Sequence, residues 1–313
     1  MLGYLLRRVL AAIPVMGVVA LVVFLLLRLT PGDPAAILAG DNATPAQLER
    51  IRASLGLNEP LYVQFFTWIG KLLHGDLGVS LISNVPVLHM IGQRIEPSIS
   101  IALATIIVSV LIAVPLGVIA AWKQGTWIDR FVMGLSVLGF SVPVFVIGYV
   151  LIQVFALDLR WLPVQGFKSI TGGFGPFLER LVLPTLALSF IYVALIARMT
   201  RASMLDVLGE DYVRTARAKG IGEIAVLFRH ALRNAAVPVI TVIGTGFALL
   251  ISGVVVTESV FNIPGIGRLT VDAVLARDYP VIQAMILLTS LLYVTINLLI
   301  DVAYTLLDPR IRY

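Results

Sequence analysis

The sequence contains no cysteine, and this absence removes several kinds of chemistry at once. Without thiols the chain cannot form disulfides, bind a metal through thiolates or use a cysteine nucleophile. Histidine is scarce as well, since only His74, His89 and His230 occur, and they lie far apart. Histidines with that spacing do not resemble a metal-ligand cluster. The sequence therefore predicts neither a bound metal nor a cofactor.

Charge is the second scarce property of the chain. Charged residues make up 13% of the 313 residues, whereas soluble domains carry about a quarter. Hydrophobic residues make up 59%, and the mean hydropathy is +0.98. This balance predicts a membrane protein. The net charge of +5 is small for this length. It gives no reason to expect a nucleic-acid partner, because basic loops are ordinary in inner-membrane proteins.

Two sequence patterns are also missing. No Gly-x-x-x-x-Gly-Lys-Ser/Thr string occurs, so the chain supplies no P-loop of its own. There is no internal repeat, and no carboxylate or polar constellation interrupts the apolar segments. An ion-coupled secondary carrier normally needs repeats and intramembrane carboxylates, and a membrane-embedded enzyme needs a polar constellation at depth. Both classes are therefore weaker interpretations of this sequence.

What the chain does contain is six long apolar segments without internal charge. Each approaches the ~20 residues that cross a hydrocarbon core about 30 Å thick. The first could be a signal peptide, but its length and the lack of a small-residue cleavage site favour an uncleaved helix. The segments are residues 9–27, 99–122, 131–156, 181–197, 235–257 and 280–300. We predict an all-α, polytopic membrane protein with about six transmembrane helices.

Lysine and arginine are distributed unevenly between the loops of this arrangement. If the N-terminus is cytoplasmic, the short cytoplasmic pieces hold most of the basic residues, and the longer outer pieces hold fewer. Basic residues concentrate in cytoplasmic loops of membrane proteins. The distribution favours N- and C-termini that both lie in the cytoplasm.

The first outer segment, residues 30–97, is too long to be a plain connector. Thr44-Pro45 is typical of a helix start, and Gly56 is typical of the end of that helix. A second apolar run, residues 61–73, contains three aromatic side chains. It is too short to span a membrane, and we expect it at the interface or packed on the helix bundle.

The chain is therefore expected to have two parts. Residues 1–97 form an N-terminal transmembrane helix with a long periplasmic segment. Residues 98–313 form a core domain with five transmembrane helices and a cytoplasmic loop at about 201–236.

The cytoplasmic loop contains a short helix signature. Glu210 and Asp211 open it, Arg217 and Lys219 close it, and Gly220 follows. Acidic residues at a helix start and basic residues at its end complement the helix dipole, and glycine suits a left-handed residue after the end. A helix of about ten residues is marginal alone in water. The pattern fits a docking element and a solvated connector equally well.

A second apolar pattern follows directly in the same loop. Its members recur at i, i+3, i+4, i+7 and i+8, which predicts an amphipathic helix at the cytoplasmic interface that leads into the fifth span through Pro238. The apolar residues are Ile224, Leu227, Phe228, Ala231 and Leu232.

Four places in the chain, the cytoplasmic loop and three others, resemble a known family. Glu-Asp-Tyr-Val-Arg-Thr-Ala-Arg-Ala-Lys-Gly at 210–220, followed by Arg-His-Ala-Leu-Arg-Asn at 229–234, resembles the EAA loop of binding-protein-dependent ABC permeases. Within that family, the dipeptide, oligopeptide, nickel and glutathione permeases are most similar. The other matching strings are Pro-Gly-Asp-Pro at 31–34, Leu-Gly-Leu-Asn-Glu-Pro-Leu-Tyr at 55–62 and Asp-Pro-Arg-Ile-Arg at 308–312. Arg214 and Thr215 depart from the general pattern, in which Glu and Ala are usual.

The resemblance covers essentially the whole chain and implies the type I ABC importer permease fold. It implies a coupling helix that enters a groove of an ATPase subunit, at Glu210, Asp211, Tyr212, Arg214, Ala216, Arg217 and Gly220. The implied partners are a second related permease, two ATP-binding subunits or domains, a periplasmic solute-binding protein and the lipid bilayer of the bacterial inner membrane. The implied function is ATP-driven import of a di- or oligopeptide, with nickel chelates or glutathione as alternative solutes. The chain itself would be a transport subunit and not an enzyme.

Several residues in the apolar segments are candidates for the translocation path or its gate. They are Pro143, Gly246, Ser252 and Gly253. Prolines kink helices and small residues let helices approach closely, so either a moving helix or plain tight packing would use them. Glu258 and Asp301 lie near the ends of spans, where we favour a structural or partner contact over a substrate ligand.

Overall fold

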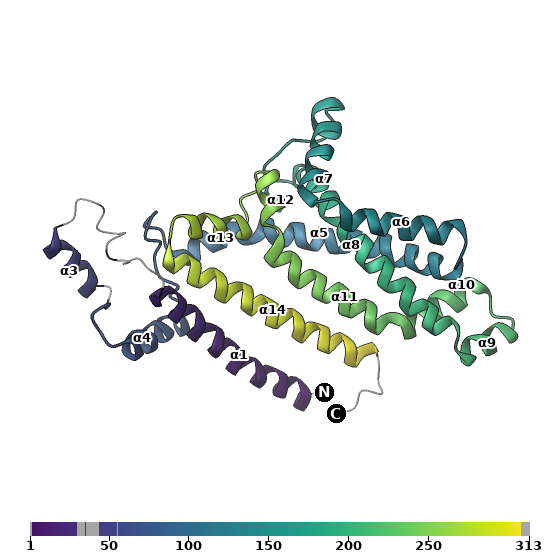
Figure 1. Ribbon diagram of the computed structural model, residues 1–313, viewed down its shortest axis with the longest axis horizontal. Helices are drawn as coiled ribbons and strands as arrows, with labels where there is room; N and C mark the ends of the chain where they lie inside the picture. The colour runs from purple at the N-terminus through teal and green to yellow at the C-terminus, as the bar shows by residue number, and fades with distance from the viewer. Residues whose placement is uncertain (1, 30–34, 36–43, 55, 308–313) are drawn as a thin grey trace.

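The computed structural model describes residues 2–29, 35, 44–54 and 56–307, and its long segments are helical (Figure 1). Within these residues no β-strand forms, and an isolated bridge joins Val79 to Pro86. The prediction of an all-α protein is confirmed. The strings at 31–34 and 308–312, and Leu55, lie outside the described residues.

Five helices in the described part are long and apolar enough to cross a membrane. They are α1 (Leu2–Leu29), α5 (Val87–Trp122), α8 (Phe174–Leu208), α11 (Leu232–Gly253) and α14 (Tyr279–Leu307). A sixth span is possible from α6 (Trp127–Ser141) and α7 (Val144–Leu151), with the π-helical turn Ile152–Asp158 that continues α7. The expectation of about six spans is confirmed.

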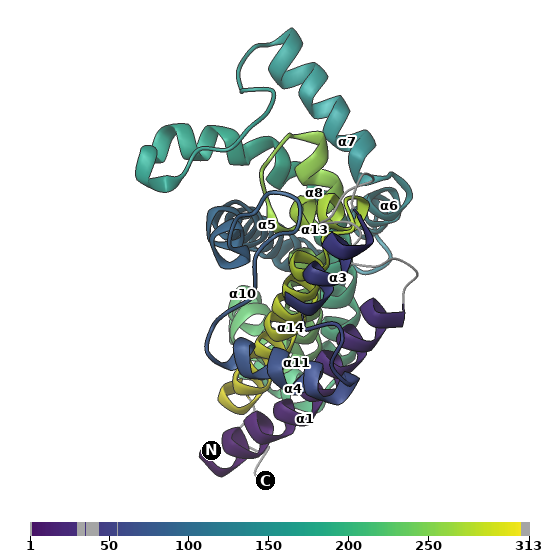
Figure 2. The same ribbon diagram turned by 90° about the vertical axis from the view of Figure 1, so that its left-hand side faces the viewer.

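The third predicted span, residues 131–156, is not a single straight helix. α6 and α7 meet at an angle of 99°. Val142 is extended (φ −95°, ψ 121°), and Pro143 (φ −60°, ψ 138°) precedes the first residue of α7. A proline donates no backbone hydrogen bond and drives the preceding residue toward extended geometry, so the chain breaks here. Figures 1 and 2 show α7 leaving the bundle instead of continuing α6.

The bounds of other helices also differ from the bounds of the predicted apolar segments. α5 begins at Val87, well before residue 99, and α8 extends past 181–197 at both ends. The added turns contain charged residues such as Arg94 and Glu179, which a search for uncharged runs excludes. α11 ends at Gly253, before residue 257. Two short helices follow it, α12 (Val255–Val260) and α13 (Ile266–Leu275).

Small residues set the spacing of the central helices. A Cβ built at Gly117 of α5 would lie 2.6 Å from the Cβ of Thr200 in α8. A Cβ built at Gly139 of α6 would lie 2.7 Å from the Cβ of Ala194, also in α8. Such close approach is how helices gain packing energy in lipid, where the hydrophobic effect does not drive them together. α8 is thereby held against both α5 and α6.

The outer segment contains the two predicted helices, α3 (Pro45–Ser54) and α4 (Leu61–Leu73). Gly56 follows α3 with a φ of +67°, as expected for a glycine after a helix end. The ring of Phe24 in α1 lies 5.3 Å from that of Phe65 and 5.8 Å from that of Trp68, measured between centroids. We expected residues 61–73 either at the membrane interface or packed on the helix bundle. These ring contacts place α4 against the helix bundle.

The two ends of the bundle are distinguished by their short helices. At one end, Arg8 of α1 forms an ion pair of 3.0 Å with Asp301 of α14, which gives Asp301 a structural contact. α9 (Asp211–Ala218) and α10 (Glu223–Ala225) also lie toward this end, and α3, α4 and α13 lie toward the other (Figure 1).

Candidate functional site

The helix predicted at about 210–219 is present as α9. Glu210 is extended (φ −71°, ψ 147°) and precedes the first helical residue, Asp211. The helix ends at Ala218, and Gly220 follows with a φ of +78°. Asp211 in the first turn and Arg217 in the last complement the helix dipole as the sequence predicted.

The inner face of α9 packs on the end of α8, at Val207 and Leu208, and on the chain that follows α9. Val213 is fully buried, and Ala216 is 7% exposed. Both belong to an apolar cluster with Val226, which lies in the π-helical turn Val226–Ala231 beyond α10. This contact provides the support that a helix of eight residues needs in water.

Two polar contacts add to this support. The Nδ2 of Asn234 in α11 donates to the Tyr212 hydroxyl at 2.7 Å. The Arg217 guanidinium donates to both carboxylate oxygens of Glu223 in α10, at 2.7 and 3.2 Å. By accepting this hydrogen bond, Glu223 raises the pKa of the Arg217 guanidinium above its ordinary value. The pair stays charged at any physiological pH.

The outer face of α9 carries a different set of residues. The side chains of Asp211 and Arg214 are 95% and 73% exposed, and they form a loose ion pair of 3.3 Å with each other. Thr215 and Ala218 are exposed as well. The residues predicted for coupling therefore divide. Asp211 and Arg214 face away from the chain, whereas Tyr212, Ala216 and Arg217 contact it.

The apolar stripe predicted after α9 is only partly buried within the protein. α10, the π-helical turn and α11 follow one another as one helical run from Glu223 that leads into the fifth span. Leu227 and Ala231 are buried as expected, but Ile224 is 77% and Phe228 44% exposed, and Val226 is buried instead. A π-helix has more residues per turn than an α-helix, so a spacing of 3.6 residues does not describe its inner face.

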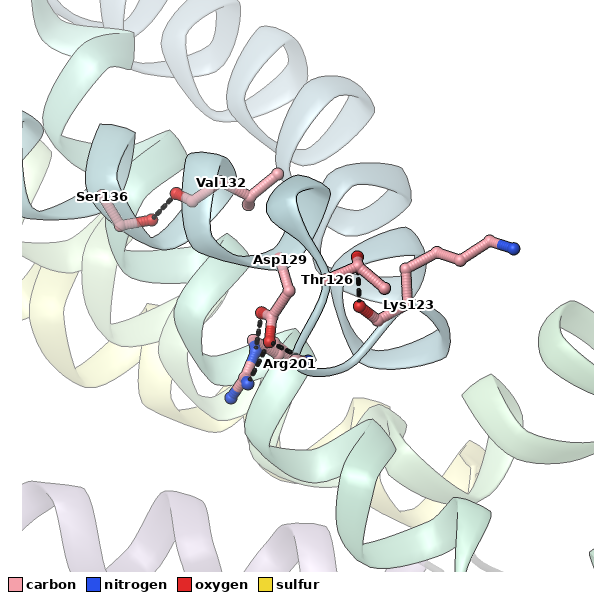
Figure 3. A network of polar contacts seen from close by, with 7 residues as sticks. Lys123, Thr126, Asp129, Val132, Ser136 and Arg201 are labelled. Carbon is pink, nitrogen blue, oxygen red and sulfur yellow. Dashed lines mark hydrogen bonds and ion pairs between the residues drawn. The ribbon is translucent and has the colours of Figure 1, made fainter.

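A second polar site at this end was not predicted. Arg201 of α8 donates through Nε and Nη2 to the two carboxylate oxygens of Asp129 in α6, at 2.5 and 2.7 Å. Asp129 also accepts from the backbone N–H of Gly125 at 2.9 Å, and it is 4% exposed. Figure 3 shows the two side chains pointing toward one another across the α6–α8 contact. The only sequence signal was an acidic residue two positions before the predicted third span.

Glu258 organises the opposite end of the core. It is fully buried, and its carboxylate accepts from the Ser98 hydroxyl of α5 at 2.5 Å and from the backbone N–H of Arg268 at 2.8 Å. Ser98 in turn accepts from the N–H of Ile266 at 2.8 Å. The first N–H groups of a helix lack partners within it, and Glu258 and Ser98 satisfy two of them at the start of α13. This agrees with the structural role that we favoured for Glu258.

The candidate path residues are not brought together. Gly246 of α11 faces Tyr192 of α8, because a Cβ built there would lie 3.1 Å from its ring. Pro143 is at the α6–α7 break and is exposed. The surroundings of Ser252 and Gly253 in α11 lie outside the described part of the structure. Whether these four residues line a path stays a prediction.

Metal and solute sites can be considered for the described residues alone. Among them, no group of three His, Cys, Asp or Glu side chains could hold a metal ion. An apolar cavity of about 230 Å³ lies between α5, α6 and α8, with Val108, Leu135 and Phe190 in its lining. No charged side chain lines this cavity, so it has no group that would pair with a charged solute.

Two family models match the chain. The model of the binding-protein-dependent transport system inner membrane component matches residues 113–313. The model of the N-terminal part of such membrane components matches residues 1–102.

Curated relatives and solved structures agree with these matches. The chain is 57% identical to a probable peptide ABC transporter permease protein of Sinorhizobium fredii, over 99% of both chains. It is 45% identical to the glutathione transport system permease protein of Escherichia coli K12, over 100% of both chains. A chain of the MetNI methionine ABC transporter is similar in fold, with a TM-score of 0.58 at 14% identity over 71% of this chain and 97% of that one.

Proposed function

Because the chain belongs to the family of binding-protein-dependent transport system inner membrane components, we propose that it forms half of the membrane path of an ATP-driven peptide importer. The other half would be a second, related permease. Small di- or oligopeptides are the proposed solutes, since the name of the Sinorhizobium relative specifies peptides. Glutathione, named for the Escherichia relative, and nickel chelates are the alternatives.

The observation that carries this proposal is α9, a capped helix that is held on one face and exposed on the other. A short exposed helix fits a groove on a partner protein. We assign the groove to an ATPase subunit, with Asp211 and Arg214 on the contacting side. Two such subunits or domains would supply the energy, because the chain has no P-loop.

The remaining assignments complete the same proposal. The chain lies in the bacterial inner membrane with both termini and α9 in the cytoplasm. Residues 30–97 and α13 would then lie outside, where a solute-binding protein docks and determines which solute is taken up. The proposed boundary between the two parts, at residues 97 and 98, lies within α5. Pro143, Gly246, Ser252 and Gly253 remain our candidates for the path.

The proposal is tested by reconstituting the complete translocator in liposomes with and without its solute-binding protein. Uptake of peptide should require ATP and the binding protein, and peptide should stimulate ATP hydrolysis only when the binding protein is present. Uptake by this chain alone along an ion gradient, or strong stimulation of hydrolysis without the binding protein, would refute it. Mass spectrometry of the solute that co-purifies with the binding protein separates peptides from glutathione and nickel chelates.

A further inference from the structure

Both polar contacts of α9 with other helices are made with the continuous helical run that contains α10 and α11. Tyr212 is joined to Asn234 near the start of α11, and Arg217 is joined to Glu223 at the start of α10. The apolar contact of Val213 with Val226 lies between them. α9 is thus attached at three points to the helical run that leads into the fifth apolar span.

The spacing of these attachments limits how α9 can move. Glu223 and Asn234 are separated by a helical run whose rise of about 1.5 Å per residue puts them roughly 16 Å apart. A short helix held by one contact can pivot about it. A helix held at two points that far apart moves together with the run that carries them.

The connection of α9 to the preceding helix is of another kind. α8 ends at Leu208, and the chain passes through Gly209 and the extended Glu210 before α9 begins. In the described structure no hydrogen bond or ion pair between side chains joins α9 to α8. Val207 and Leu208 of α8 do pack on the apolar cluster of Val213, Ala216 and Val226, so the polar side-chain contacts are what distinguishes the attachment of α9 to the run of α10 and α11 from its attachment to α8.

We propose that Asn234 and Glu223 are positioning residues for energy coupling, which transmit the displacement of α9 to the fifth span through Tyr212 and Arg217. The inference rests on the proposed function, in which an ATPase subunit moves α9. Asn234 and Glu223 act through α9 and do not contact the ATPase. Both contacts are at least partly exposed, so they contribute little to folding, and their loss leaves the protein assembled.

The test compares variants in proteoliposomes that contain the complete translocator and its binding protein. Peptide uptake and ATP hydrolysis are measured in the same sample, and their ratio is the readout. Tyr212→Phe, which removes only the hydroxyl, should lower the ratio by roughly two- to fivefold, the factor expected when a partly exposed polar contact is lost. Asn234→Ala should have the same effect, and the double variant should be no worse than either single one.

The Arg217–Glu223 ion pair is tested separately, by reversing its charges. Glu223→Arg should lower the ratio, and combining it with Arg217→Glu should restore the ratio because the ion pair forms again with reversed charges. Arg233→Ala changes an exposed neighbour of Asn234 and should match the unsubstituted protein.

Three outcomes would overturn the inference. The ratio could stay unchanged in Tyr212→Phe and Asn234→Ala, the reversed pair could fail to restore it, or Asn234→Ala could lose the ATPase on purification, which would indicate direct docking. If the unsubstituted complex takes up no peptide with ATP, the proposed function is refuted, and this inference, which rests on it, is refuted as well. That result is distinguishable because it requires no variant.

Discussion

At the scale of single residues, the conformation of Gly220 is the feature on which the end of α9 depends. Its φ is +78°, and a Cβ built there would meet no atom within 4 Å. Space is therefore not what requires glycine. The left-handed conformation disfavours an L-residue by about 1–2 kcal/mol, and a β-branched side chain adapts to it least well.

Gly220→Val should therefore loosen the end of α9 and weaken ATPase docking. We expect transport by the reconstituted complex to fall about tenfold, the factor that corresponds to the middle of that range, with normal membrane insertion. Co-purification of the ATPase and peptide uptake measure the effect. Gly222→Val is the matched control, because Gly222 also has open space around its Cβ but has a φ of −60°. If the two variants behave alike, the backbone conformation is not the cause.

At the scale of helices, the Asp129–Arg201 pair has consequences that the exposed pairs lack. It joins the first turn of α6 to α8, and its two side chains are 6% and 23% exposed. Screening by water makes exposed ion pairs nearly neutral for stability, whereas removing one member of a buried pair leaves a charge without its partner. The position of α6 beside α8 should therefore depend on this contact.

Asp129→Ala is expected to destabilise the purified protein by about 2 kcal/mol, less than for a fully buried pair because Arg201 keeps some access to water. Thermal unfolding in detergent measures this change. The double variant Asp129→Ala, Arg201→Ala should be less destabilised than the sum of the single variants.

The exposed pair Asp211–Arg214 is the control for the double-mutant cycle of Asp129 and Arg201, since its side chains are 95% and 73% exposed. Its single and double alanine variants should be additive within error. Additive behaviour of Asp129 and Arg201 as well would show that their contact does not hold α6 to α8.

At the scale of the whole molecule, the two ends of the bundle differ in what they expose. α9 and α10 lie toward one end, and the hairpin around the Val79–Pro86 bridge and α13 lie toward the other (Figure 1). Asp278 fastens this hairpin, because it accepts from the Ser80 hydroxyl at 2.5 Å and from the N–H of Leu81 at 3.1 Å. The orientation that we propose puts the hairpin outside and α9 in the cytoplasm.

The lack of native cysteine makes this orientation directly testable. Ser83→Cys, at an exposed position of the hairpin, should react with an impermeant thiol reagent on intact spheroplasts. Ala218→Cys, at the exposed end of α9, should react only after permeabilisation. Ser80→Cys is the internal control, because Ser80 is 1% exposed and should not react in either case. The opposite labelling of residues 83 and 218 would reverse the orientation.

Local patterns in the sequence sufficed for the class of the protein and for most of its elements. Runs of apolar residues identify the spans because burial in lipid excludes charge, wherever the rest of the chain lies. The ends of α9 follow from the order of Glu210, Asp211, Arg217 and Gly220, since helix capping is satisfied within a few residues. The same holds for Pro45 and Gly56 around α3.

Tertiary structure decided what depends on residues far apart in the chain. Pro97, Pro115 and Pro184 lie inside continuous helices, whereas the chain turns by 99° at Pro143, because neighbouring helices determine which proline a helix can tolerate. The side-chain partners of Asp129 and Glu258, which are Arg201 and Ser98, lie 72 and 160 residues away, beyond any local pattern. The elements on which Val213 and Ala216 of α9 pack, the end of α8 and the π-helical turn, were likewise decided by tertiary structure. Sequence periodicity describes one helix at a time, and these contacts arise only when helices meet.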